Sequence, residues 1–186
     1  MQVLIVYHSD YGHTQSVAEA IVAGVQTVLS EEGLTASSEV SVQLASQVTL
    51  DAMREADVLI FGSPVHMGSM AWQMKQLIDK GSKMWLEGAL EGKIGGVFAT
   101  FGGFGAAGGG VEQTLIALHA NFLEHGMLVC GFPRALTGYA DGGVHWGLAV
   151  RTSNHEGMPE GVSEAALVAA RSYGAHVLET ALRLAS

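Results

Sequence analysis

The chain has 186 residues, of which 48% are hydrophobic and 15% are charged, and its net charge is −9. This length allows a sizeable core, and we expect residues 1–186 to form a single domain. The acidic balance disfavours nucleic acid and anionic membranes as partners, because both need basic patches. No charged segment precedes Val3 and no apolar run approaches the roughly 20 residues of a membrane span, so we expect a cytoplasmic protein. The single Cys130 excludes an internal disulfide.

Short apolar runs typical of strands alternate with segments of helical periodicity along the chain. We expect strands at residues 3–7, 39–44, 58–62, 94–101 and 148–151. Apolar stripes predict helices within residues 17–29, 70–78, 111–122 and 166–184. Residues 127–130 fit either a short strand or an extension of the helix before them. The third strand run is continuously apolar, which indicates that helices cover both faces of a parallel sheet.

A loop with several hydroxyl groups follows the first expected strand and leads directly into a helix. The start of a helix presents unpaired N–H groups and the positive end of its dipole, and the hydroxyls of Ser9 and Thr14 can add hydrogen bonds to an anion. No Lys or Arg lies between Gln2 and Met53, so amides and hydroxyls would hold a phosphate here without an ammonium group. The alternative is an ordinary capped helix after a strand.

Two more loops are expected at the carboxyl ends of strands, where open α/β sheets bind ligands. They span residues 62–70 and 100–110, and the second is rich in glycine. Residues 103–108 also spell a dinucleotide fingerprint between a strand and a helix. However, they follow the fourth strand, and no acidic residue ends the next one, so a Rossmann-type site is disfavoured.

Four motifs occur in order along nearly the whole chain. They are Tyr7-His8-Ser9-Asp10-Tyr11-Gly12-His13-Thr14, Phe61-Gly62-Ser63-Pro64, Met67-Gly68-Ser69-Met70 with the following Gln73-Met74-Lys75 and Leu77-Ile78-Asp79, and Gly108-Gly109-Gly110 with Glu112-Gln113-Thr114. Together they resemble the flavodoxin-like NAD(P)H:quinone oxidoreductases of the WrbA type. The resemblance implies an α/β, flavodoxin-like three-layer sandwich with a five-stranded parallel sheet in the order 2-1-3-4-5.

The resemblance also implies FMN as cofactor, NADH or NADPH as electron donor, a quinone-like acceptor, and a homodimer or homotetramer with active sites near the subunit contacts. By position, it implies that one group of residues binds the phosphate end of FMN and that two groups flank its ring. These cofactor-binding residues are Ser9, Asp10, Tyr11, Gly12, His13 and Thr14, then Pro64, Val65, His66, Met67 and Gly68, and finally Thr100, Phe101, Gly102 and Gly103. His66-Met67 departs from the family, which commonly has Arg-Phe there.

Three side chains are candidates for a direct part in the reaction. His125 and His66 could stabilise an anionic reduced flavin or a quinone oxyanion, and the alternative for each is a helix-capping or solvated imidazole. Trp85 matches a family position that lines the site of a neighbouring subunit, and the alternative is a core anchor. The histidines form no HExxH motif and there are no paired cysteines, so we expect no metal site.

The preferred interpretation is an FMN-dependent enzyme that transfers hydride from NAD(P)H through FMN to a quinone-like acceptor. The alternative is a flavodoxin-type electron-transfer protein without a substrate pocket of its own. A third, less favoured interpretation is a flavodoxin-like domain that has lost FMN.

Overall fold

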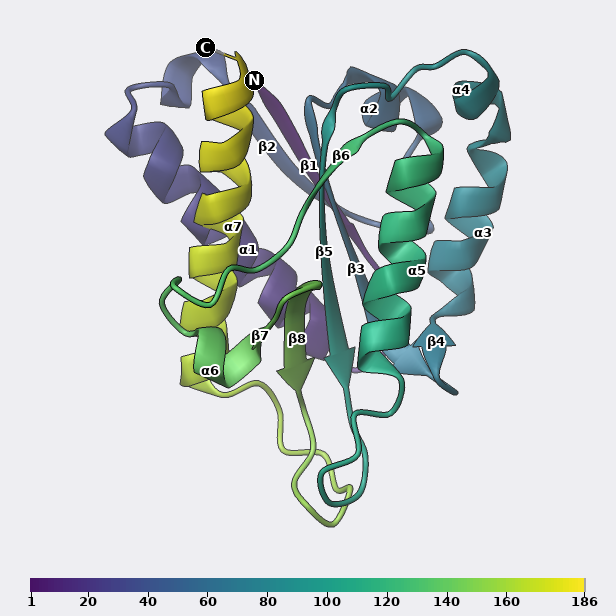
Figure 1. The fold of residues 1–186 in the computed structure, drawn as a ribbon, viewed down its shortest axis with the longest axis vertical. Helices are drawn as coiled ribbons and strands as arrows, with labels where there is room; N and C mark the ends of the chain where they lie inside the picture. The colour runs from purple at the N-terminus through teal and green to yellow at the C-terminus, as the bar shows by residue number, and fades with distance from the viewer. Residues whose placement is uncertain (186) are drawn as a thin grey trace.

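A twisted, mostly parallel β-sheet runs through the centre of the molecule, and helices cover both of its faces (Figure 1). The computed structural model describes residues 1–185. The strands are β1 (Gln2–Tyr7), β2 (Glu39–Leu44), β3 (Val58–His66), β4 (Ser69–Met70), β5 (Ile94–Phe101), β6 (Leu128–Cys130), β7 (Gly143–Val144) and β8 (Gly147–Arg151).

The strand order confirms the predicted sheet. The order along the main path is β2-β1-β3-β5-β8-β7, and the five predicted strands β1, β2, β3, β5 and β8 are parallel and follow the order 2-1-3-4-5. Three short strands extend the predicted set of five. β4 and β7 pair antiparallel with β3 and β8, and β6 pairs parallel with β5.

The edge beside β5 is shared by two separate strands. β6 pairs with the amino half of β5 and β8 pairs with its carboxyl half. Residues 127–130 therefore contain a strand, which decides between the two alternatives that the sequence left open. After β6 the chain leaves the sheet, forms α6 (Tyr139–Gly142) and returns to the sheet as β7, which pairs with β8.

The helices form one layer on each face of the sheet. α1 and α7 lie side by side on one face, and α2 to α5 cover the other (Figure 1). The remaining helical bounds are α1 (His13–Glu31), the 3-10 helix η1 (Thr35–Ser37), α2 (Leu50–Glu55), α3 (Trp72–Lys80), α4 (Ser82–Leu86), α5 (Val111–Glu124) and α7 (Glu164–Ala185). None of the helices described in residues 1–185 combines the length and apolar character that crossing a membrane requires.

Both faces of the central strands are buried, as the continuous apolar runs predicted. Along β3, Val58 and Ile60 pack toward α1 and α7, whereas Leu59 and Phe61 pack toward the other helical layer. Two details of the predicted stripes were wrong. Met70 belongs to β4 and not to a helix, and Leu184 in the last turn of α7 is 61% exposed.

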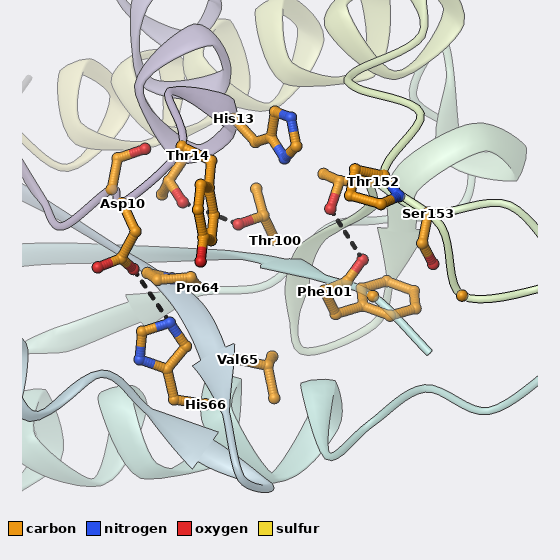
Figure 2. A pocket seen from close by; sticks show the side chains of 15 residues that line it. Asp10, His13, Thr14, Pro64, Val65, His66, Thr100, Phe101, Thr152 and Ser153 are labelled. Atoms are coloured by element: carbon orange, nitrogen blue, oxygen red, sulfur yellow. Dashed lines mark hydrogen bonds and ion pairs between the residues drawn. The ribbon is translucent and has the colours of Figure 1, made fainter. Parts of the chain in front are cut away.

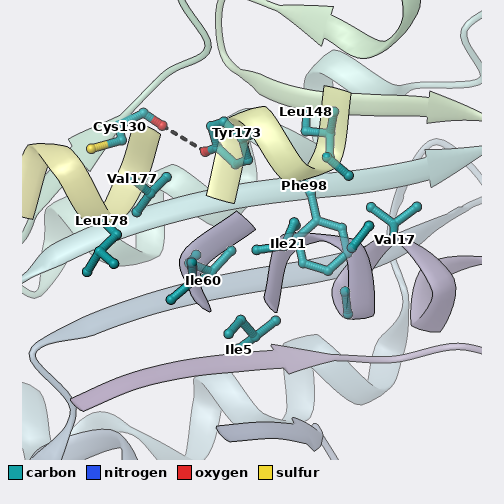
Figure 3. Packing of buried hydrophobic residues seen from close by; sticks show 14 of the residues in the cluster. Ile5, Val17, Ile21, Ile60, Phe98, Cys130, Leu148, Tyr173, Val177 and Leu178 are labelled. Atoms are coloured by element: carbon teal, nitrogen blue, oxygen red, sulfur yellow. Dashed lines mark hydrogen bonds between the residues drawn. The ribbon is translucent and has the colours of Figure 1, made fainter. Parts of the chain in front are cut away.

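A buried tyrosine links α7 to two strands of the sheet (Figure 3). The hydroxyl of Tyr173 donates to the carbonyl oxygen of Cys130 at 3.0 Å and accepts from the N–H of Val97 at 2.9 Å. Burial raises the pKa of Tyr173 far above its usual value, so the phenol stays neutral and can make both bonds. Burial also raises the pKa of the Cys130 thiol, which keeps the thiol protonated and unreactive near neutral pH.

Candidate functional site

Strand ends and loops meet at the carboxyl edge of the parallel strands and line a pocket of about 210 Å³ (Figure 2). We call it the carboxyl-edge pocket. The last residues of β3 and β5 line it together with residues that follow β1, β5 and β8. The lining residues are Ser9, Asp10, Tyr11, His13, Thr14, Pro64, Val65, His66, Thr100, Phe101, Gly102, Thr152, Ser153, Gly157 and Pro159. Pockets that enclose a drug-sized ligand are typically about 300–1,000 Å³, so a large planar ligand held here would keep part of its surface open.

The loop between β1 and α1 has unsatisfied donors that suit an anion. The Ser9 Oγ atom is buried and has no hydrogen-bond partner within residues 1–185. α1 begins after Gly12, whose φ of +85° reverses the chain, and none of the described side chains caps it. The first-turn N–H groups of a helix have no intrahelical acceptor and lie at the positive end of its dipole. A phosphate therefore fits this loop, because it accepts hydrogen bonds from both kinds of donor.

Two buried threonine hydroxyls join the start of α1 to the end of β5. The Oγ1 atoms of Thr14 and Thr100 are 2.8 Å apart, although the residues are 86 positions apart in the sequence (Figure 2). One hydroxyl donates to the other, so the accepting hydroxyl keeps its own proton for a third group. The pair places that free donor in the wall of the carboxyl-edge pocket.

The Asp10 carboxylate links the β1–α1 loop to the end of β3. Its two oxygens lie 3.1 Å from the Nε2 atoms of His8 and His66, and Figure 2 shows the contact with His66 at the pocket rim. Beyond His66 the chain turns tightly into β4 through Met67 and Gly68, which have φ values of +48° and +84°. The turn leaves the Met67 side chain fully exposed.

The glycine-rich loop after β5 is joined to the loop after β8. The Arg151 guanidinium donates to the carbonyl oxygens of Gly103 at 2.6 Å, Ser153 at 2.9 Å and Asn154 at 3.2 Å. The N–H of Gly103 also donates to the Ser153 hydroxyl at 3.0 Å. These bonds make the two loops one wall of the pocket. They project together beyond the end of the sheet (Figure 1).

Most of the residues that the resemblance assigned to the cofactor lie together at this pocket. Eleven line it: Ser9, Asp10, Tyr11, His13, Thr14, Pro64, Val65, His66, Thr100, Phe101 and Gly102. Gly12, Met67, Gly68 and Gly103 belong to the same loops but are not among the lining residues. Four lining residues were not predicted from the sequence: Thr152, Ser153, Gly157 and Pro159. The available signal was their position after the fifth strand, at the same edge of the sheet as the other three loops.

The structure does not bring His125 and Trp85 to this pocket. His125 follows the end of α5, where the neighbouring Gly126 accepts a hydrogen bond from Gly92, just before β5 begins. Trp85 lies on α4, also at the amino end of β5 (Figure 1). Burial lowers the pKa of His125, which keeps the ring neutral near pH 7. Because both residues lie at the opposite edge of the sheet, a direct role is open to them only at the site of a neighbouring subunit.

Known proteins resemble this chain over nearly its whole length. Residues 37–135 match the family described as NADPH-dependent FMN reductase. The chain is 36% identical to a protein from Geotalea daltonii named NAD(P)H dehydrogenase (quinone), over 99% of this chain and 98% of that one. A relative of the same name from Solidesulfovibrio magneticus is also 36% identical, over 99% of each chain.

Solved structures show the same fold. A WrbA-like flavodoxin from Agrobacterium tumefaciens superposes with a TM-score of 0.68 at 26% identity, covering 98% of both chains. An archaeal flavodoxin superposes with a TM-score of 0.69 at 22% identity, covering 98% of this chain and 99% of that one. The second likeness concerns the fold alone.

Proposed function

Because the chain belongs to the NADPH-dependent FMN reductase family, as a flavodoxin-like relative of the WrbA type, we propose that it is an FMN-dependent NAD(P)H:quinone oxidoreductase. The observation that carries the proposal is the buried, unpartnered Ser9 hydroxyl beside the uncapped start of α1. When bound, FMN supplies the hydride chemistry between a nicotinamide and a quinone. The protein supplies binding, orientation and shielding from water.

We assign the phosphate end of the cofactor to the β1–α1 loop. There the hydroxyls of Ser9 and of the Thr14–Thr100 pair would donate to phosphate oxygens, together with the first-turn N–H groups of α1. The flavin ring would lie against the carboxyl ends of β3 and β5, where Pro64, Val65 and Phe101 offer apolar surface. Hydrogen bonds to a charged group contribute about 1.5–3 kcal/mol each, so the hydroxyls suffice for firm binding without an ammonium group.

The limited volume of the pocket supports alternating use by the two substrates. A flat ring that is partly uncovered leaves one face for the nicotinamide and, after the nicotinamide has left, for the quinone. The wall that Arg151 stabilises would shield one side of the bound ring from water. The proposal therefore includes a two-step exchange at a single site.

Flavin titration and turnover test the proposal together. We expect the purified protein to bind FMN more tightly than FAD, because the β1–α1 loop suits one terminal phosphate, and to oxidise NADH or NADPH when benzoquinone is added. FMN binding without quinone turnover would favour the flavodoxin-type electron carrier. If neither flavin binds, the proposed function is wrong.

The proposal extends to assembly as a homodimer or homotetramer and to a cytoplasmic location, where NAD(P)H is available. Large apolar side chains near α3 and α4 support assembly: Trp72, Trp85 and Leu86 are 65%, 47% and 76% exposed. We propose that Trp85 reaches the pocket of a neighbouring subunit. Trp85→Ala should then reduce quinone turnover while FMN stays bound, and light scattering should detect an oligomer in the wild type. A fully active monomer would contradict this part of the proposal.

A further inference from the structure

The loops that follow β5 and β8 carry two exposed apolar side chains beside the carboxyl-edge pocket. We call residues 102–110 and 152–161 together the two-loop flap, which projects beyond the end of the sheet (Figure 1). Phe104 on the first loop is 76% exposed, and Met158 on the second is 59% exposed. Neither side chain belongs to the core, so both offer apolar surface to a ligand.

Contacts between the two loops hold this surface in place. The N–H of Gly105 donates to the carbonyl oxygen of His155 at 2.7 Å, and Phe104 forms an isolated antiparallel bridge with Glu156. The guanidinium of Arg151 joins the same two loops nearer the sheet. A ligand that lies against the flap therefore meets a backbone that is already ordered, which lowers the entropic cost of binding.

The apolar surface of the flap is continuous with the wall of the pocket. A Cβ added to Gly157 would lie 3.0 Å from the Phe104 ring, so the ring lies directly against Gly157. Gly157 and Pro159 line the carboxyl-edge pocket, and Met158 lies between them in the chain. The pocket is too small to enclose a flavin and a second ring together. A substituent on the second ring would therefore extend over the rim that the flap forms.

The charge of the flap indicates which kind of substituent it suits. Its two loops contain no Lys or Arg, and their carboxylates are those of Glu156 and Glu160, both exposed. These charges repel the anionic pyrophosphate of a nicotinamide dinucleotide but not an uncharged alkyl chain. A methionine also adapts its shape to an irregular apolar partner. The flap therefore favours an apolar chain over a dinucleotide.

We propose that Phe104 is a specificity-determining residue, which together with Met158 binds an apolar chain on the quinone acceptor. The flap thereby selects quinones that carry such a chain. This inference rests on the proposed function and names the class of acceptor at the same site. A methylene that is fully removed from water contributes about a fourfold gain in affinity, so a chain that is partly covered by the flap should contribute about 10- to 100-fold.

Calorimetry on the FMN-loaded protein without NAD(P)H tests the inference in the absence of turnover. The probes are decylbenzoquinone and methylbenzoquinone, which differ only in the length of the chain. We expect the wild type to bind decylbenzoquinone about 10- to 100-fold more tightly, and Phe104→Ser to lose about 10-fold of this preference. Phe104→Leu should keep most of it, because leucine retains an apolar side chain. Equal affinity of the wild type for both probes would overturn the inference.

Trp146→Ser is the matched control, because it also removes an exposed aromatic ring. Trp146 is 50% exposed and directly precedes β8, whereas the flap begins after the other end of that strand. This variant should keep the wild-type preference for decylbenzoquinone. An equal loss of preference in Trp146→Ser and Phe104→Ser would show that the position of the ring is irrelevant, which would overturn the inference.

Steady-state kinetics and light scattering test the other ligands that Phe104 could contact. In Phe104→Ser the KM for decylbenzoquinone should rise relative to that for methylbenzoquinone. A higher KM for NADH with an unchanged quinone preference would assign Phe104 to the dinucleotide, and a smaller assembly with an unchanged preference would assign it to a subunit contact. Either result would overturn the inference alone. If neither quinone is bound or reduced by the wild type, the proposed function fails as well, so the two failures are distinguishable.

Discussion

Replacing Ser9 by alanine should change apoprotein stability and cofactor affinity in opposite ways. The Ser9 Oγ atom is buried without a partner in the described chain, and a buried unsatisfied polar atom costs about 1–3 kcal/mol. Removing it should therefore raise the unfolding free energy of the apoprotein by up to that amount. The same change removes a donor to the phosphate, which contributes about 1.5–3 kcal/mol. That loss corresponds to an FMN dissociation constant about 10- to 150-fold larger.

Ser63→Ala is the matched control, because Ser63 is a buried serine whose hydroxyl is satisfied. Its Oγ donates to the Pro64 carbonyl oxygen and accepts from the Ala71 N–H, both at 2.8 Å. Losing these bonds should destabilise the apoprotein by about 1–3 kcal/mol. Urea denaturation of flavin-free protein measures the stabilities, and quenching of FMN fluorescence measures the affinities. If Ser9→Ala destabilises the apoprotein as Ser63→Ala does, or leaves FMN affinity unchanged, the assignment of Ser9 to the phosphate is refuted.

Three further predictions concern the fold. Tyr173→Phe should lower the unfolding free energy in urea by about 2–5 kcal/mol, because two buried backbone groups lose their partner, and an unchanged midpoint would contradict this. Gly12→Ala should lower the unfolding free energy only by the left-handed backbone strain of about 1–2 kcal/mol. Gly110→Ala should lower it clearly more, because the added Cβ would also lie 2.6 Å from neighbouring backbone. Equal shifts of the melting temperature in the two variants would contradict this prediction. Burial lowers the pKa of His119, so the unfolded chain binds protons more readily and the unfolding free energy should fall as pH drops from about 6.5 toward 5. His119→Phe should flatten that pH profile, and an unaltered profile would show that another group is responsible.

The sequence by itself determined the layers of the fold and the edge of the sheet at which the carboxyl-edge pocket lies. Continuous apolar runs such as Val58 to Phe61 require cover on both faces, and hydrophobic periodicity is a local property that can be read without the fold. Parallel strands end at a common edge, so the loops that follow them must converge. For that reason, Ser9, Pro64 and Thr100 could be assigned to one site although they lie far apart in the chain.

The tertiary structure decided which side chains meet and which are kept apart. The contacts of Thr14 with Thr100 and of Asp10 with His66, and the junction of two loops at Arg151, depend on side-chain directions that no local pattern specifies. His125 shows the opposite case. A helix that leaves the carboxyl edge of a parallel sheet returns to the amino edge, so the end of α5 carries His125 away from the edge at which the pocket lies.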